Sequence, residues 1–272
     1  MTTRNISFLI YKILNFLDKI FEFITRRSFI IYVGEFIRNN SVIEKKILNK
    51  KILFFATTEL IKWRVKTIYN KEPETINWIN NFKKNSIFWD IGANIGLYSI
   101  YAALKLKKIK IMAFEPSSLN YNILAKNISM NKLNTKINIF QIPLTSYKNK
   151  FLNFNETSFS EGSALHSFNT KTSKKKILNS YKIYGTSIDF LIKNKIVDFP
   201  DYVKIDVDGI EDKILNSAKS LLKSKKLKSV LIETSISKKK NIIKLLKKNN
   251  FIIKDSHLLK DSNEVNLIFA KK

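Results

Sequence analysis

Short apolar runs and amphipathic stretches alternate along the chain from about residue 86 onward. The apolar runs have the length of strands, and between most of them apolar residues recur every three or four positions, as in a helix that packs on one face. The predicted strands cover residues 87–91, 109–114, 137–142, 202–207, 229–233, 250–254 and 264–270, and the predicted helices cover 95–106, 118–130, 187–194, 211–223 and 237–249. This alternation predicts an α/β fold with a seven-stranded, mostly parallel sheet and helices on both faces. No helix separates the last two strands, which indicates a closing hairpin.

The N-terminal segment is amphipathic with a helical period. Between Ile6 and Arg27, polar residues recur every three or four positions and leave a broad apolar face. Charges interrupt every window, so no apolar stretch is long enough to cross a bilayer, and no small-residue cleavage site marks a secretory signal. Two interpretations remain open. Either the helix packs on the following domain or a second subunit, or it lies on a membrane surface.

The rest of the chain divides into a linking region, a main domain and one insertion. Residues 41–85 are expected to be helical, so we expect an N-terminal helical extension over residues 1–70 and the α/β domain over residues 71–272. Residues 148–185 are rich in Ser, Thr, Asn and Lys and interrupt the alternation. So long an irregular segment in a compact domain is usually functional or disordered, and its position predicts a lid above the ligand crevice.

Composition narrows the chemistry. The chain has no cysteine and only two histidines, which excludes thiol nucleophiles, disulfides, iron–sulfur clusters and histidine-rich metal sites. The net charge of +27 is typical of nucleic-acid binders, but those proteins cluster their charge, whereas here the first seventy residues hold about the share that their length predicts. A basic surface still favours contact with anionic lipid or lipopolysaccharide.

The stretch from Phe88 to Ser99 carries the strongest local signal. It reads as a buried strand that turns through two glycines into a helix, with Asp90, Gly92, Asn94 and Gly96 spaced as D-x-G-x-N-x-G. Glycines allow a close backbone approach to a ligand, and the start of a helix supplies unpaired N–H groups. The spacing is not that of the dinucleotide fingerprint. An ordinary tight turn between strand and helix is the alternative reading.

Two later strands end in acids. Glu115 follows Gly96 by 19 positions, and at that distance in a doubly wound sheet a carboxylate can accept hydrogen bonds from both ribose hydroxyls of a nucleoside. Asp206 and Asp208 stand at the end of the strand predicted over 202–207, where an acid faces the crevice and can orient or deprotonate a hydroxyl, or help to hold a divalent cation. The alternatives are a surface carboxylate for Glu115 and acids that favour a helix N-terminus for the later pair.

Taken together, these segments resemble the FkbM family of S-adenosylmethionine (SAM)-dependent methyltransferases, over roughly residues 54–270. The further markers are Glu72-Pro73-Glu74-Thr75 with Trp78, Gly162-Ser163, Thr186-Ser187-Ile188-Asp189, and Val230-Leu231-Ile232-Glu233. The resemblance implies a Rossmann-like class I methyltransferase fold. It also implies that SAM is bound at positions matching Asp90, Gly92, Asn94, Gly96 and Glu115.

The resemblance also implies a reaction. Family members methylate oxygen atoms, typically hydroxyls of sugars, glycolipids and polyketide-type products, so we expect an O-methyltransferase acting on a glycan, glycolipid or surface polysaccharide. A sugar hydroxyl needs a base as the C–O bond forms. Asp206 is the first candidate for that base, and the loop residue His166 is the second, although a polar loop histidine is the alternative reading. Alternatively, Asp206 and Asp208 hold a Mg²⁺ ion that acidifies the hydroxyl. Asp208 stands where the family has glutamate.

Two other functions compete with this interpretation. A nucleic-acid methyltransferase would use the same fold and the positive charge, but the chain has no N-P-P-Y or D-P-P-Y segment and no cysteine for pyrimidine C5 chemistry. A non-catalytic membrane-surface protein could keep a relic nucleotide fold, although the retained glycines and acids argue against decay. We expect a cytoplasmic protein, with peripheral contact to the inner membrane through residues 6–27 and self-association as open alternatives.

Overall fold

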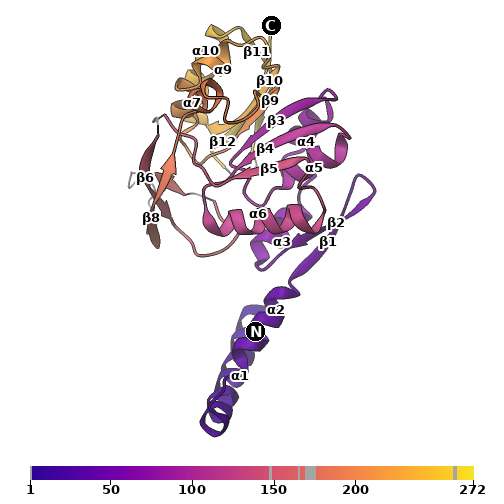
Figure 1. Cartoon of the computed structure of the whole chain (residues 1–272), viewed down its shortest axis with the longest axis vertical. Helices are drawn as coiled ribbons and strands as arrows, with labels where there is room; N and C mark the ends of the chain where they lie inside the picture. The colour runs from indigo at the N-terminus through magenta and orange to yellow at the C-terminus, as the bar shows by residue number, and fades with distance from the viewer. Residues whose placement is uncertain (1, 147–148, 165, 169–175, 260–261) are drawn as a thin grey trace. The chain divides into compact units, whose positions relative to one another are not determined.

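The computed structural model describes residues 2–146, 149–164, 166–168, 176–259 and 262–272 (Figure 1). The described chain divides into two compact units, Met1–Ile43 and Glu44–Lys272. The domain boundary predicted at residue 70 stays a prediction, because a division by contacts does not tell which segment folds by itself. Part of the predicted lid, residues 169–175, lies outside the described residues.

The smaller unit is built from α1 (Thr3–Thr25) and α2 (Ile30–Asn39). The helix expected over residues 6–27 is therefore present. The buried Asp18 side chain fixes the turn that follows α1, since it accepts hydrogen bonds from Ser28 Oγ at 2.8 Å and from the backbone N–H groups of Phe29 at 2.6 Å and Ile30 at 3.1 Å. Across the described residues of the whole chain, we find no helix with the length and apolar character needed to span a membrane.

A β-hairpin stands where the sequence predicted helix. Strands β1 (Val42–Ile47) and β2 (Lys50–Phe55) are joined by Leu48 and Asn49, both left-handed with φ of 48° and 64°. Two consecutive left-handed residues form the tight turn that matches the twist of a hairpin. The helical expectation was wrong here because the spacing of the few apolar residues fits a helix and a half-buried strand equally well. The helices α3 (Glu59–Lys66) and α4 (Pro73–Asn80) follow within the region that was correctly expected to be helical.

The main sheet confirms the predicted architecture. Its strands in the described chain are β3 (Ser86–Ile91), β4 (Ile109–Phe114), β5 (Ile137–Phe140), β9 (Tyr202–Ile205), β10 (Ser229–Ser235), β11 (Phe251–Leu258) and β12 (Glu264–Lys271). They lie in the order β11-β12-β10-β9-β3-β4-β5, with β12 antiparallel to both of its neighbours and the other neighbours parallel. The seven strands match the seven predicted from the sequence, and the closing hairpin is β11–β12.

Helices cover the sheet on both faces (Figure 1). They are α5 (Leu97–Lys105), α6 (Ser118–Met130), α7 (Ile188–Lys193), α8 (Glu211–Asn216), α9 (Lys219–Lys223) and α10 (Ile236–Lys248). Side chains alternate along β3, so Trp89 and Ile91 join the core formed with α7 to α10, while Phe88 packs with Phe82 and Trp78 on the opposite face. The single helix predicted over 211–223 is divided at Ser217, whose hydroxyl donates to the carbonyl of Thr145 at 3.0 Å.

The insertion before β9 is more regular than the sequence indicated. Strands β6 (Lys150–Glu156), β7 (Ser167–Phe168) and β8 (Asn179–Gly185) form a small antiparallel sheet among the described residues, in the order β7-β6-β8. The expectation of an irregular segment was therefore wrong for these strands. The side chains of β8 alternate between half-buried and exposed positions, as in a half-exposed strand. This alternation was missed in the sequence because polar residues occupy many of the positions.

Candidate active site

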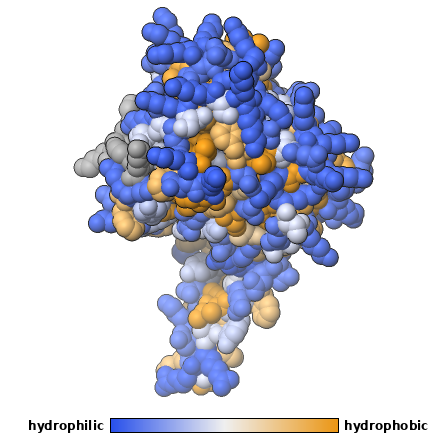
Figure 2. All heavy atoms as spheres, turned by 45° about the horizontal axis from the view of Figure 1, so that its top comes forward, coloured by the Kyte–Doolittle hydropathy of each residue, from blue (hydrophilic) through white to orange (hydrophobic). Residues whose placement is uncertain are grey.

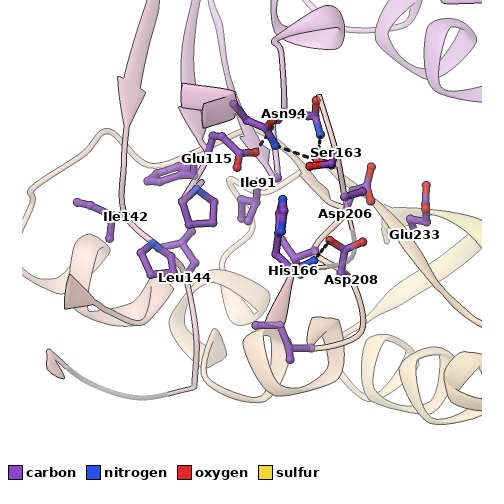
Figure 3. Close-up of a pocket in the computed structure, with 18 of the residues that line it drawn as sticks. Ile91, Asn94, Glu115, Ile142, Leu144, Ser163, His166, Asp206, Asp208 and Glu233 are labelled. Carbon is purple, nitrogen blue, oxygen red and sulfur yellow. Dashed lines mark hydrogen bonds between the residues drawn. The ribbon is translucent and has the colours of Figure 1, made fainter. Parts of the chain in front are cut away.

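A pocket with a cavity volume of about 190 Å³ lies at the carboxyl ends of the central strands (Figure 3). The chain runs from β3 to β4 on one side and returns to β9 on the other, so the pocket sits where the strand order reverses. Residues that line it include Gly92, Asn94, Phe114, Glu115, Ile142, Leu144, Ser163, His166, Asp206, Asp208 and Glu233. A concave pocket with apolar walls and a few convergent polar groups is typical of sites for small molecules and cofactors.

The glycine turn after β3 is shaped by its neighbours. Gly92 has a φ of +85°, and a Cβ atom there would lie 1.8 Å from the backbone oxygen of Asp206. Gly96 has a φ of +88°, and its Cβ would lie 2.5 Å from a methyl group of Leu124. Only glycine fits either position without movement of the neighbours. The first glycine thus lets the β3 turn pass directly beside the end of β9, which brings Asn94 and Asp206 to one pocket.

Glu115 lies at the base of the pocket, at the end of β4. Its carboxylate accepts hydrogen bonds from the backbone N–H groups of Asn94 at 2.8 Å and Ser117 at 2.9 Å. Burial nevertheless raises the pKa of Glu115 to about 7, because the two N–H groups offset only part of the cost of removing the charge from water. A buried acid with a pKa near neutrality, facing a cavity, is a functional-site candidate on physical grounds.

Asp90 and Gly96 are not among the residues that line the pocket. The Asp90 carboxylate is almost fully buried and accepts a hydrogen bond from Ser99 Oγ at 2.6 Å, while its second oxygen has no hydrogen-bond partner within the described part of the chain. Burial raises the pKa of Asp90, against the opposing influence of Lys204 and Ser99. Asp90 therefore ties β3 to α5 beneath the glycine turn, and its predicted role in SAM binding stays a prediction.

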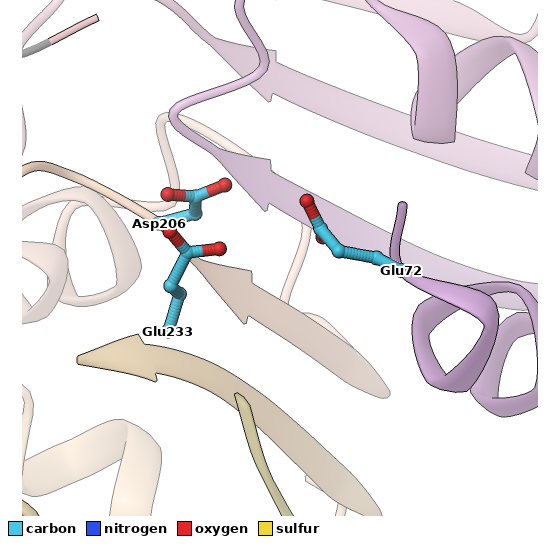
Figure 4. Close-up of side chains that lie close together, drawn as sticks. All are labelled: Glu72, Asp206 and Glu233. Carbon is cyan, nitrogen blue, oxygen red and sulfur yellow. The ribbon is translucent and has the colours of Figure 1, made fainter. Parts of the chain in front are cut away.

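Charged side chains gather around Asp206 on the other side of the glycine turn (Figure 4). Carboxylate oxygens of Glu72, Asp206 and Glu233 lie within 4.8 Å of one another, although they come from three distant parts of the chain. Two lysines supply counter-charge. The buried Lys204 donates to Asp206 at 2.6 Å, and Lys71 donates to Glu72 at 2.5 Å.

The charges of this cluster set the protonation of its members. Burial opposes ionisation of Asp206, but the Lys204 ammonium outweighs that penalty and lowers the pKa of Asp206. Burial would lower the pKa of Lys204, yet Asp206 and the other acids raise it. Burial, together with the negative charges of Asp206 and Glu72, raises the pKa of Glu233 to about 10. At neutral pH the cluster thus holds an ionised Asp206 beside a protonated Glu233.

This cluster bears on the predicted Mg²⁺ site. Among the described residues, the carboxylates that approach one another closely enough to share a cation are Glu72, Asp206 and Glu233, and Asp208 is not in that group. Lys71 and Lys204 already donate to two of the three carboxylates. The oxygen donors suit Mg²⁺, but the ammonium groups occupy the places where a hard cation would bind. Metal binding by Asp206 and Asp208 stays a prediction.

His166 and Asp208 lie together beside Asp206 (Figure 3). The backbone N–H of His166 donates to the Asp208 carboxylate at 3.2 Å, and the histidine ring stands 5.4 Å from the ring of Phe154. Neither ring nitrogen of His166 has a hydrogen-bond partner among the described residues, and burial lowers its pKa. A neutral imidazole can accept a proton, so His166 keeps the chemistry of a base.

Hydrogen bonds hold a loop of the insertion over the glycine turn. Side-chain amides of Asn94 and Asn120 both donate to the carbonyl of Ser163 at 3.0 Å, and Arg64 Nε donates to the carbonyl of Gly162 at 2.7 Å. The family marker Gly162-Ser163 therefore meets the turn after β3 directly. The φ of +82° at Gly162 and its contact with Ile61 favour glycine there.

Beside the pocket lies a second, smaller hollow. It shares Arg64, Lys71, Gly92, Asn94 and Asp206 with the first, and it adds Ile68, Glu72, Ala93, Ile95, Leu97, Tyr98 and Lys204. It thus joins the start of α5 to a group of paired acids and bases. The two hollows together form one elongated site that crosses the glycine turn.

Sequence reasoning assigned no role to Arg64, Lys71, Glu72, Glu233 or Lys204, which all border this site. Glu72 and Glu233 belong to markers of the resemblance, so the signal was present without a function attached to it. Arg64 and Lys71 follow no motif. They reach the site because the α3–α4 segment lies against the start of α5, a proximity that local periodicity does not encode.

Comparison with known proteins identifies the domain. A family model described as the methyltransferase FkbM domain matches residues 90–253, more than half of the chain. The hexuronic acid methyltransferase AglP of Haloferax volcanii is 25% identical over 206 residues, which cover 75% of this chain and 79% of that protein. The methyltransferase sdnD of Sordaria araneosa is 38% identical over 68 residues, which cover 25% of this chain and about a quarter (26%) of that protein.

Among solved structures, the precorrin-6y C5,15-methyltransferase of Geobacter metallireducens aligns with a TM-score of 0.47 at 14% identity, over 74% of this chain and 87% of that one. The M. capricolum TrmK structure with S-adenosyl-homocysteine aligns with a TM-score of 0.46 at 19% identity, over 72% and 67%. The resemblance seen in the sequence is confirmed by the family match and by the order of the strands. The chain belongs to the FkbM family of methyltransferases.

Proposed function

We propose that this protein transfers a methyl group from SAM to a hydroxyl oxygen of a sugar, in a glycan, glycolipid or surface polysaccharide. The observation that carries the proposal is the pocket that places Glu115 on one side of the glycine turn and Asp206 on the other. A nucleoside would meet the buried Glu115 carboxylate there, and an acceptor hydroxyl the half-buried Asp206 carboxylate. Membership of the FkbM methyltransferase family supplies the reaction class.

The chemistry of the pocket fits SAM. Glu115 is positioned to accept hydrogen bonds from ribose hydroxyls, and Phe114, Ile142 and Leu144 line an apolar part of the pocket that suits an adenine ring. The methionine portion carries one carboxylate and one ammonium group. In the smaller hollow, Arg64 and Lys71 can pair with the carboxylate of the methionine portion, and Glu72 can pair with its ammonium group. The N–H groups at the start of α5 lie beside them.

Bound SAM supplies a methyl group on a positively charged sulfur. Among the residues that the structure describes, two basic side chains and five acidic ones line the larger pocket, so even with Glu233 protonated the lining favours a cation. The same balance disfavours an anionic acceptor and favours a neutral hydroxyl. The protein's main task is then to align that hydroxyl with the methyl group and to exclude water.

The acceptor proton would pass to Asp206. Its carboxylate is ionised at neutral pH, faces the pocket and keeps a fixed orientation through Lys204. The protonated Glu233 beside it can donate a hydrogen bond to a sugar oxygen next to the acceptor oxygen and so orient the sugar. His166, which is neutral and lines the same pocket, is the second candidate for the base.

A sugar acceptor is also supported by a relative. The archaeal protein that aligns with three quarters of this chain is called a hexuronic acid methyltransferase. At 25% identity, that name supports a sugar as the acceptor class, while the acidic lining of the pocket supports a hydroxyl as the atom that is methylated.

Calorimetric titration with SAM, and separately with NAD, tests the proposal first. We expect micromolar SAM binding, weakened by Glu115→Ala, and no binding of NAD. Incubation with methyl-labelled SAM and glycan acceptors should then give a labelled product whose methyl is an ether, stable to mild base. A base-labile methyl ester would contradict the hydroxyl acceptor, and a folded protein without SAM affinity would contradict the whole assignment.

A further inference from the structure

The N-terminal helices carry an apolar surface that the proposed reaction does not use. On α1 the exposed apolar side chains are Ile6, Phe8, Leu9, Ile10, Tyr11, Ile13, Phe16, Leu17, Ile20, Phe21, Phe23 and Ile24, each more than 40% exposed. On α2 they are Ile31, Tyr32, Phe36 and Ile37, each more than 60% exposed. An exposed apolar surface this extensive marks a site of interaction with a protein or a membrane.

Most apolar positions of α1 form one continuous face, whereas Phe8 and Tyr11 lie on the polar half. Residues such as Ile6, Leu9, Ile13, Leu17 and Ile24 follow the three-and-four spacing that aligns side chains along a helix. Most of the polar positions lie on the opposite half. The apolar half is wider than the seam of a coiled coil, which is limited to two positions in every seven. Figure 2 shows apolar side chains of the N-terminal helices at the surface beside hydrophilic ones.

Basic residues border this face in a regular row. Lys12, Lys19 and Arg26 are spaced seven residues apart, so they lie along one side of α1, next to the apolar positions Phe16 and Phe23. Long basic side chains at such a border can lay their methylene groups on an apolar environment and extend their charges toward phosphates. All three are exposed.

The exposed charges of the smaller unit are mainly positive. Six basic side chains, those of Arg4, Lys12, Lys19, Arg26, Arg27 and Arg38, are exposed, against two exposed acids, Glu22 and Glu35. The third acid, Asp18, is buried and engaged with the start of α2. The unit therefore presents positive charge beside its apolar face.

We propose that α1 and α2 form a docking surface for an anionic lipid bilayer, with the apolar face of α1 in the interfacial layer and the row of Lys12, Lys19 and Arg26 at the phosphates. A large apolar face, basic residues at its border and abundant Phe and Tyr are the features of helices that lie in a membrane interface. The charges within α1 prevent it from crossing the bilayer, so the helix lies along the surface.

Vesicle flotation of the full-length protein tests this proposal. The probes are vesicles of phosphatidylcholine alone and vesicles in which about one third of the lipid is phosphatidylglycerol. We expect flotation with the anionic vesicles, at least tenfold weaker partitioning to the neutral ones, and loss of that difference in high salt, because salt screens the attraction.

Three double variants identify the surface. Ile13→Gln with Leu17→Gln removes two apolar contacts without a change of charge and should lower partitioning by about a hundredfold or more. Ser7→Gln with Asn15→Gln places the same residue type on the polar half and should bind like the wild type. Lys12→Gln with Lys19→Gln should lower binding to anionic vesicles by on the order of tenfold and leave binding to neutral vesicles unchanged.

Several results would overturn the proposal. The full-length protein could remain with the aqueous phase at low salt, or the apolar-face and polar-face variants could float equally well. Sedimentation analysis without lipid tests the alternative that a second copy of the chain packs on the apolar face. A stable oligomer that the Ile13→Gln/Leu17→Gln variant dissociates, together with absent flotation, would assign the face to a second copy of the chain. A lower melting temperature of the whole protein in that variant would assign it to packing within the chain.

Discussion

The protonation of Glu115 is expected to control the affinity for SAM. Burial raises the pKa of this carboxyl to about 7, so it loses its proton within the physiological range. The ionised form accepts hydrogen bonds from ribose hydroxyls with both oxygens, whereas the protonated form has lost part of that capacity. Binding therefore favours the ionised form, and the Kd for SAM should rise about tenfold as the pH falls from about 8 to about 6.

Calorimetry at several pH values checks this prediction. Wild-type protein should release a proton on binding SAM at the lower pH, which buffers of different ionisation enthalpy reveal. Glu115→Gln should bind more weakly and with a flat pH profile. A Kd that is the same at both pH values in the wild type, or a slope that survives in Glu115→Gln, would remove Glu115 from the binding site.

Glu233 should limit stability at higher pH. Its pKa in the folded protein is raised to about 10 by burial and by Asp206 and Glu72, whereas in the unfolded chain it ionises near its ordinary pKa of about 4.3. The native state thus holds a proton that the unfolded state releases, so the stability contributed by this proton is complete at low pH and declines as the pH rises toward about 10. Glu233→Gln keeps the shape and abolishes that decline.

Denaturant unfolding at about pH 5 and about pH 8 measures the effect. Glu233→Gln should be more stable than the wild type at the higher pH and similar to it at the lower pH. Glu264→Gln, at the edge of the same pocket, serves as the control for removal of a carboxyl and should not reproduce the difference. Equal pH dependence in Glu233→Gln and wild type would show that Glu233 ionises normally.

Asp206→Asn tests the proposed base. The amide cannot take up the acceptor proton, so kcat should fall by roughly 10²-fold or more. SAM binding should persist, since Glu115 and the glycine turn are untouched. Asp198→Asn is a matched control, because Asp198 pairs with Lys110 away from the pocket and its variant should retain full turnover. Full turnover in Asp206→Asn, with SAM binding intact, would transfer the role to another group, with His166 next to be replaced.

At the scale of elements, the site depends on how closely the turn after β3 approaches β9. A Cβ at position 92 would lie 1.8 Å from the backbone oxygen of Asp206, and the left-handed φ adds strain. We expect Gly92→Ala to cost more than about 3 kcal/mol of unfolding free energy and to weaken SAM binding, because the turn and the β9 end must separate.

Gly209→Ala separates the cost of backbone strain from the cost of the close contact with β9. Gly209 also has a left-handed φ, +100°, but open space surrounds its Cβ position, so its replacement carries strain alone and should cost about 1–2 kcal/mol. Thermal unfolding of both variants measures the difference. If Gly92→Ala costs no more than Gly209→Ala, the close approach of the turn to β9 does not constrain the fold.

The predictability of the elements follows from how strongly each one is patterned. The central strands β3, β4 and β9 are buried on both faces and form nearly continuous apolar runs between turn residues, so local sequence was enough to find them. The β1–β2 hairpin and the β6–β8 sheet are half exposed, and Lys, Asn and Ser occupy many of their positions. Their pairing depends on partners elsewhere in the chain, which a local period does not reveal.

The same reasoning applies to the site. Glu115 and Asp206 were identified because each ends a predicted strand, and parallel strands that belong to one sheet bring their carboxyl ends together. Arg64, Lys71 and Glu72 precede the sheet in the sequence, and their position at the pocket depends on how α3 and α4 pack. Periodicity predicts the layers of such a domain, but it does not predict which segment outside the sheet closes the crevice.

On the scale of the whole molecule, the charge of the larger pocket and the net charge of the chain have opposite signs. The chain carries a net charge of +27, whereas the larger pocket is lined by more acids than bases. The basic exterior favours anionic surfaces by long-range attraction, and the acidic pocket favours the cationic sulfur of SAM at short range. One chain can therefore be drawn to anionic lipid without offering an anion-binding active site.

If both proposals hold, the apolar face of α1 matters only for acceptors held in a membrane. Ile13→Gln/Leu17→Gln should raise KM at least tenfold for a glycolipid in anionic vesicles, because the enzyme no longer concentrates at their surface. For a water-soluble glycan with the same sugar, kcat and KM should match the wild type, since neither residue lines the pocket. The Ser7→Gln/Asn15→Gln variant should behave as wild type with both acceptors. An equal loss of activity on both would mean that the face stabilises the enzyme itself and does not dock it.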